Sequence, residues 1–244
     1  MKIITAFLLY LLVNNSYCAT FEDGENAYKK GNYSKAMSIW LPLAEQGDAK
    51  AQNYIGVIYA NGNGISQNLE LATKWYQLAA AQGNVNAQSN MGNLYAYRLN
   101  TKKYEEAVKW WQLAADKGNK SSQINLGWYY MNGFENLPTN LIDYQAAKYW
   151  NEQGAKNGDA EGYNNLGWLY ENGLGVVRNY TKAAELYQKA VTEGIRTGAK
   201  QNNIDEARSR LENVEAKLAK MKYTKKIKSN SSMQINNDPL NIRN

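Results

Sequence analysis

A spaced pattern of small and aromatic residues recurs along the chain and constrains its fold more than any other feature. At residues 72–83, Ala72 is followed by Trp75 three positions later, by alanines seven and eight positions later, and by Gly83. Copies of this spacing, the first of them looser, start at Ala36, Ala107, Ala147 and Ala183. Successive copies begin 36, 35, 40 and 36 residues apart. A period in this range is the signature of a helical-repeat array, whose units contact mainly their neighbours.

Each unit is predicted to hold two helices joined by a short turn. In the clearest unit, residues 49–61 form the first helix, glycines at 62 and 64 mark the turn, and residues 69–82 form the second helix. A glycine inside the first helix costs about 1 kcal/mol relative to alanine. It nevertheless recurs, as Gly56, Gly92, Gly127 and Gly167. We therefore expect the paired helices to approach closely there. The second helices should build the core with Trp75, Trp110 and Trp150, and with Tyr76 and Trp111 beside them.

These motifs resemble the Sel1-like repeat, a relative of the tetratricopeptide repeat. The resemblance is carried by Ile-Gly-x-x-Tyr at 55–59, Gly-x-Gly-Ile at 62–65 and Ala-x-x-Trp-Tyr-x-x-Ala-Ala-x-x-Gly at 72–83, and again by residues 166–176. It implies an all-α fold, an α-solenoid of about five antiparallel helix pairs. A 3,4-spaced apolar seam from Ile204 to Met221 predicts a C-terminal capping helix, with coiled-coil dimerisation as the alternative. The predicted organisation is a signal peptide at 1–19, a tetratricopeptide-like pair at 20–48, Sel1-like units at 49–84, 85–119, 120–159 and 160–194, a capping helix at 203–222, and a disordered basic tail at 223–244.

The N-terminus has the pattern of a secretory signal. Lys2 precedes an apolar run at residues 3–13, and residues 16–19 form a plausible cleavage zone. We therefore expect export, to the periplasm if the source is a Gram-negative bacterium. A buried N-terminal helix is the alternative. Lipidation at Cys18 is a second alternative, although Tyr17 stands where a small residue is preferred.

Composition argues against several classes of function. The chain has no histidine and one cysteine, so histidine-based catalysis and common zinc sites are not expected. The net charge of +6 comes from Lys2 and from a net of +5 in residues 220–244, so the repeats are balanced and carry no basic stripe for nucleic acid. We expect no catalytic residues, no metal and no cofactor.

Candidate binding residues are found at positions where the residue type differs from one repeat to the next. Aligned on the first-helix glycine, positions −3, +1 and +4 share one helical face and vary between units. In tetratricopeptide relatives such first helices line a concave groove. The candidates on this face are Asn53, Asn93, Ile124, Trp128, Met131, Asn164, Trp168 and Glu171. An insertion in the fourth unit adds Phe134, Glu135 and Asn136. Clustered aromatic and methionine residues are typical of a protein-binding hot spot, although the two tryptophans could instead fill gaps between helices.

The expected function is therefore non-catalytic protein binding by a monomer. The family resemblance implies more: some small exported Sel1-repeat proteins act as immunity proteins that neutralise type VI secretion toxins, notably lipases of the phospholipase D class, in the periplasm. An envelope scaffold or host-interaction factor is the alternative. Enzymatic activity of the β-lactamase-like subgroup is a remote alternative, because those members carry paired cysteines in each repeat.

Overall fold

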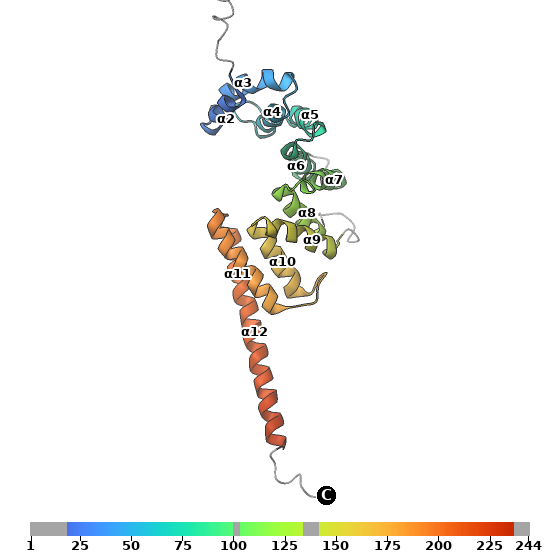
Figure 1. The fold of residues 1–244 in the computed structure, drawn as a ribbon, viewed down its shortest axis with the longest axis vertical. Helices are drawn as coiled ribbons and strands as arrows, with labels where there is room; N and C mark the ends of the chain where they lie inside the picture. Colours follow the sequence, from blue (N-terminus) through green and yellow to red (C-terminus); the bar gives the residue numbers. More distant parts are fainter. Residues whose placement is uncertain (1–18, 100–102, 134–141, 237–244) are drawn as a thin grey trace, which may run out of the picture. The chain divides into compact units, whose positions relative to one another are not determined.

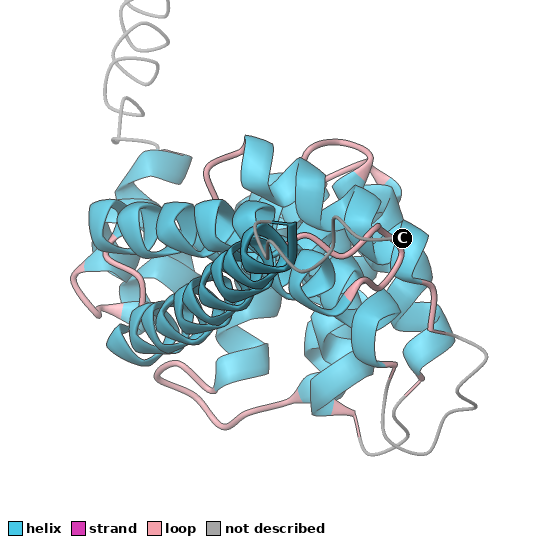
Figure 2. Ribbon diagram, turned by 90° about the horizontal axis from the view of Figure 1, so that it is seen from below, coloured by secondary structure: helices cyan, strands magenta, loops and turns pink. Residues whose placement is uncertain are grey.

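The computed structural model describes residues 19–99, 103–133 and 142–236, with side chains as far as residue 228 (Figure 1). All regular elements of these segments are helices, and none is a strand (Figure 2). The fold is thus all-α, a solenoid of helix pairs, which confirms the predicted class. It divides into two compact units, one ending at Lys117 and the other beginning at Gly118. The predicted signal peptide lies outside the described residues, except for its last residue, Ala19.

The N-terminal unit consists of successive helices, each packed against the next. Its third helix pair contains a short π-helical segment where the other Sel1-like units have glycines in the turn, and this segment follows α6 without a break. The elements are α2 (Phe21–Lys29), α3 (Tyr33–Glu45), α4 (Ala49–Asn61), α5 (Leu69–Ala81), α6 (Val85–Asn93), η1 (Leu94–Arg98) and α7 (Tyr104–Ala115).

The C-terminal unit follows the same order of packing. In it α8 packs on α9, α10 lies between α9 and α11, and α12 covers α11. The helices are α8 (Lys120–Asn132), α9 (Tyr144–Lys156), α10 (Ala160–Asn172), α11 (Tyr180–Thr197) and α12 (Gln201–Asn236).

Short polar residues determine where the helices begin. Gly47 adopts a φ of 98°, and the next residue, Asp48, caps α4 by accepting a hydrogen bond from the Ala51 amide at 2.7 Å. Asparagine or aspartate side chains cap α5, α6 and α8–α11 in the same way. Such caps satisfy amides that have no partner inside the helix, so the sequence itself sets these boundaries.

The deepest core position lies one residue beyond the repeating tryptophan. Trp150 is buried, but Trp75 and Trp110 are only half-buried and pack at the edges of the core clusters. The equivalent next residues are almost completely buried in every unit: Trp40, Tyr76, Trp111, Asn151 and Tyr187. The prediction for Tyr76 and Trp111 is confirmed, and Trp75 and Trp110 contribute only to the edge of the core.

The glycines of the first helices face these buried side chains. A Cβ atom on Gly92 would lie 2.3 Å from Cδ1 of Trp111, and one on Gly56 would lie 2.6 Å from Cδ1 of Tyr76. Gly167 stands in the same relation to Tyr187. No side chain fits in these positions without displacing a packed ring, so the close approach expected from the recurring glycine is confirmed.

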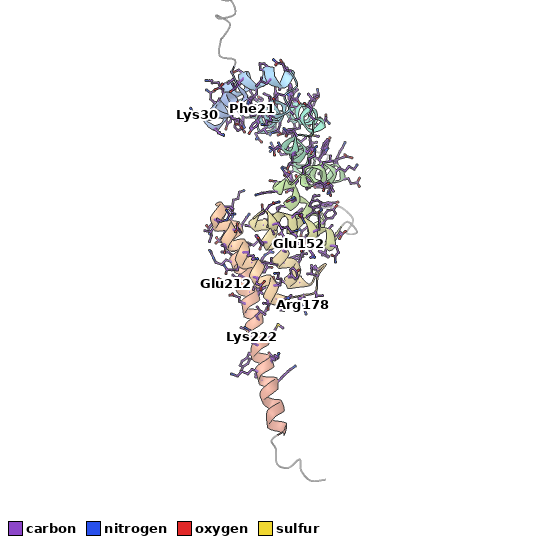
Figure 3. All side chains as sticks on the ribbon, in the orientation of Figure 1. Phe21, Lys30, Glu152, Arg178, Glu212 and Lys222 are labelled. Atoms are coloured by element: carbon purple, nitrogen blue, oxygen red, sulfur yellow. The ribbon has the colours of Figure 1, made fainter. Side chains whose placement is uncertain are left out.

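The C-terminal helix is longer than predicted. Ile204, Ala207 and Val214 are buried against the last repeat, as a capping helix requires. The helix then continues to Asn236, so the prediction of disorder from residue 223 is wrong as far as that residue; residues 237–244 lie outside the described part. Residues 201–236 contain neither glycine nor proline to stop the helix. Residues 219–228 are exposed, and Lys222 projects from this part (Figure 3).

Candidate protein-binding groove

A groove of about 810 Å³ opens on the C-terminal unit. Its walls come from α8 and α10, from the end of α11, and from the first turns of α12. Thus the helices of two successive repeats and the capping helix all contribute residues. Such a groove is large enough to receive several side chains of a partner.

Two tryptophans line this groove. Trp128 and Trp168 occupy the same position in successive repeats, directly after Gly127 and Gly167, and the structure brings both to one groove. The side chain of Trp128 is 38% exposed and that of Trp168 is half-buried. A partly open indole offers a large rigid apolar surface to a partner.

The next feature is a group of carboxylates at the start of α10. Asp159 caps the helix, accepting from the Glu161 amide at 2.9 Å. Glu161 lines the groove and remains exposed to solvent, so only partial desolvation raises the pKa of its carboxyl, with further contributions from the negative charges of Asp159 and Glu206. Three basic residues also line the groove: Lys120 donates to the Asn157 carbonyl at 2.9 Å, Arg210 pairs with Glu206, and Lys200 is exposed. Glu161 thus lies near two other carboxylates in a groove that basic side chains also line.

Asn164 and Asn165 supply polar atoms to the lining of the groove. Asn165 donates to Oδ1 of Asn151 at 3.0 Å, and Asn151 in turn donates to the Ala147 carbonyl at 2.8 Å. Asn164 is different: it is only 9% exposed, and its Oδ1 is buried without a hydrogen-bond partner. A buried acceptor left unpaired costs about 1–3 kcal/mol, so a donor that reached this oxygen would recover that free energy.

The structure separates the predicted residues of this unit into two groups. Trp128, Met131, Asn164 and Trp168 line the groove. Ile124 does not, because it fills the space that Gly154 leaves: a Cβ on Gly154 would lie 2.4 Å from Cδ1 of Ile124.

Glu171 is also a structural residue. It is 9% exposed and accepts from the Tyr187 hydroxyl at 2.7 Å and from Nζ of Lys217 at 2.8 Å, which ties α10 to α11 and α12. For Ile124 and Glu171, the expectation of an open surface was therefore wrong. It was also wrong for Met131, which lines the groove but is 6% exposed and belongs to a core cluster.

Two further candidates belong to the N-terminal unit. Oδ1 of Asn53 accepts from Asn90 at 2.9 Å, and Oδ1 of Asn93 accepts from the Trp111 indole at 3.0 Å. Both therefore link helices within the unit. The loop candidates Phe134, Glu135 and Asn136 lie outside the described residues.

Sequence reasoning missed Glu161, Asn165 and the α12 residues of the groove. Acidic residues at the start of α10 are ordinary helix-start residues, and Asp159 does act as a cap. Nothing in the repeat period placed the first turns of α12 opposite α10. Among the described residues, no group of three or more histidine, cysteine, aspartate or glutamate side chains could hold a metal ion, and no helix is long and apolar enough to cross a bilayer.

Stacked helix pairs and an open groove with aromatic walls define this chain as a helical-repeat protein of the protein-binding class. Comparison with known families makes the assignment specific. The model of the Sel1 repeat matches residues 17–48, 49–84, 85–119, 120–159 and 160–195. The chain therefore belongs to the Sel1 repeat family and is a protein-interaction module of that family.

Solved structures and curated relatives agree with this family. A Sel1 repeat protein from Oxalobacter formigenes is 31% identical, with a TM-score of 0.64 over 72% of this chain and 71% of its own. The protein c5321, described as a protective antigen of uropathogenic Escherichia coli, is 30% identical, with a TM-score of 0.66 over 84% of this chain and 48% of its own. HcpE of Helicobacter pylori, named as a candidate beta-lactamase, is 36% identical over 72 residues, which are 26% of this chain and 19% of HcpE. The chain spans less than a fifth of the curated relatives it matches.

Proposed function

We propose that this chain is an exported, non-catalytic binding protein that holds a protein partner in the groove of its C-terminal unit. The observation that carries the proposal is the exposure of Trp128 on the wall that also contains Trp168. Buried aromatic anchors supply most of the binding energy in many protein interfaces. A side chain 38% open to water in the free chain can gain that energy only when a partner covers it.

The more specific proposal is an immunity protein for a type VI secretion effector, such as a phospholipase or lipase toxin in the periplasm. It is supported by the resemblance to small exported Sel1-repeat proteins with this role, and by the signal-like residues 1–19. The mechanism would be obstruction: the toxin inserts a surface element into the groove, and its active-site mouth is covered.

An envelope scaffold or host-interaction factor is the second candidate. The similarity to c5321, described as a protective antigen, favours it. A β-lactamase-like activity has less support. The match to HcpE covers 19% of that protein. This chain has one cysteine, whereas the β-lactamase-like members of the family have paired cysteines in each repeat.

Capture of partners from the native host tests the binding proposal. Residues 20–244 should retain a protein partner, and Trp128→Ala with Trp168→Ala should weaken its binding at least about 30-fold, since hot-spot truncations cost about 2 kcal/mol or more. Tyr149→Ala is the matched control, because Tyr149 is 52% exposed in the same unit but does not line the groove. Unchanged affinity in the double variant would refute the groove as the binding site. A large fall in melting temperature would instead place both tryptophans in the core.

The immunity proposal needs a separate experiment. The captured partner, directed to the periplasm of a test bacterium, should arrest growth, and co-expression of this chain should restore it. The double tryptophan variant should fail to protect, while the Tyr149 variant protects. A partner that is harmless, or an envelope or host protein, would contradict immunity and favour the second candidate.

A further inference from the structure

Three chemically different groups lie on one face of α10, and all three line the groove. Glu161, Asn164 and Trp168 are spaced by three and four residues, which places them in successive turns of the same helical face. In order they present a carboxylate, an amide oxygen and an indole. One ligand side chain lying along this face could therefore contact all of them.

The two polar groups on this helical face are hydrogen-bond acceptors, so they favour a ligand that donates hydrogen bonds. Oδ1 of Asn164 is a buried acceptor without a partner. The Glu161 carboxylate lines the same groove, is exposed to solvent and lies near the acidic groups Asp159 and Glu206, although basic side chains also line the groove. A positively charged hydrogen-bond donor satisfies both oxygens, whereas an anion would meet like charge and a purely apolar group would leave Asn164 unpaired.

The tryptophans that line the groove also indicate which kind of cation fits it. A guanidinium group is planar, stacks on aromatic faces and carries five donors in a fixed plane, so it can contact an indole while donating to two acceptors. A lysine ammonium is a compact, strongly hydrated charge that offers no flat surface for stacking. The arrangement of carboxylate, amide oxygen and indole therefore fits arginine better than lysine.

We propose that the groove captures an arginine side chain of the protein partner, stacked on Trp168 and Trp128 and donating to Glu161 and to Oδ1 of Asn164. The inference deepens the proposed function, on which it rests, by specifying the chemistry of the partner. The partner would present this arginine on a protruding loop, since the side chain must reach between α8, α10 and α12, which wall the groove. Insertion would give a donor to Oδ1 of Asn164, which is buried without a hydrogen-bond partner.

The direct test uses the free chain and small probes. Acetyl-Gly-Arg-Gly-amide should shift the indole ¹H–¹⁵N resonances assigned to Trp128 and Trp168 at millimolar concentration. The citrulline peptide, which has the same shape without the charge, and the glutamate peptide should not. The lysine peptide should bind more weakly than the arginine peptide. Equal shifts from all four peptides, or none from the arginine peptide, would overturn the proposal.

Asn164→Leu separates a binding role from a structural one. Replacing an unpaired buried acceptor by an apolar side chain of similar size removes a desolvation cost, so the melting temperature should stay the same or rise. Binding of the arginine peptide should nevertheless weaken about tenfold, and Glu161→Gln should weaken it similarly. A lower melting temperature with unchanged peptide binding would show that Asn164 supports the fold only.

Tests with the captured partner distinguish failure of this inference from failure of the proposed function. If the tryptophan variant loses the partner while Asn164→Leu and Glu161→Gln bind it normally, the groove binds by other chemistry and only the arginine inference falls. If none of the three variants affects partner binding, the proposed function itself fails. The fraction of dimer could rise with the concentration of this chain, and the dimers could dissociate when the arginine peptide is added. That result would show that a second copy occupies the groove, which would also overturn the proposal.

Discussion

Substitution of Gly92 by alanine should destabilise the N-terminal unit, although alanine is the better helix former. Gly92 lies in α6 against the indole of Trp111 in α7, and an added Cβ would lie 2.3 Å from Cδ1 and 2.4 Å from Nε1 of that ring. The ring has little freedom to move, because it is fully buried and its Nε1 donates to Asn93 at 3.0 Å. Relief of the clash must therefore separate the helices or break this hydrogen bond.

The magnitude follows from three opposing contributions. Overpacking of one methyl group costs about 1–3 kcal/mol, and loss of the indole hydrogen bond costs about 1 kcal/mol. Replacing glycine by alanine in a helix returns about 1 kcal/mol. The net loss of unfolding free energy should therefore be about 1–3 kcal/mol, which lowers the melting temperature of a unit of this size by at least about 4 °C.

Urea unfolding followed by circular dichroism and by tryptophan fluorescence measures this loss, provided that the two transitions coincide. Trp111→Leu supplies the control background. Once the ring is gone, Gly92→Ala should be neutral or stabilise by up to about 1 kcal/mol, the helix-propensity gain alone. If Gly92→Ala stabilises the wild-type chain by that same amount, the close approach of the two helices is not what excludes a side chain.

Two further predictions concern the C-terminal unit. Lys217→Met should lower the unfolding free energy by about 1–2 kcal/mol, because the buried Glu171 carboxylate keeps its hydrogen bond from the Tyr187 hydroxyl but loses its cation. Urea unfolding measures this free energy, and an unchanged value would mean that the Lys217–Glu171 pair does not hold α12 in place. Partial desolvation raises the pKa of Glu161 above its ordinary value of 4.5, so the folded chain keeps this proton to higher pH than the unfolded chain. Stability should therefore fall as the pH rises from about 4.5 through the folded-state pKa, by a small amount because Glu161 is exposed to solvent. Glu161→Gln should remove that fall, as urea midpoints between about pH 4 and 8 would show; an unchanged profile would place the carboxyl in full contact with solvent.

Much of the fold follows from local patterns in the sequence. The period near 36 residues and the asparagine and aspartate caps predict paired helices, and the capped helix starts in the structure confirm the role of those residues. The recurring first-helix glycine predicts close contact because it has an energetic cost that only packing can offset. The length of α12 was not predicted, because lysine and serine are compatible with both a solvated helix and a disordered tail.

The binding site was only partly predictable. Variation in residue type between the repeats predicted Trp128 and Trp168 as binding residues, and the structure brings both to one groove. The same criterion selected Ile124, whose burial depends on the missing side chain of Gly154, thirty residues away in another helix. Variation between repeats therefore has two physical causes, an open surface or a compensated core, and a single sequence does not separate them.

By itself, the sequence determined the repeat architecture, the capped helix starts and the absence of histidine, because these depend on residues close together in the chain or on composition alone. Tertiary structure decided which variable positions are open. It buried Glu171 against Tyr187 and Lys217. It also placed α10, which contains the unpaired oxygen of Asn164, and the start of α12 in the walls of one groove. Burial and hydrogen-bond partners depend on neighbours from other helices, and those neighbours are set only when the repeats stack.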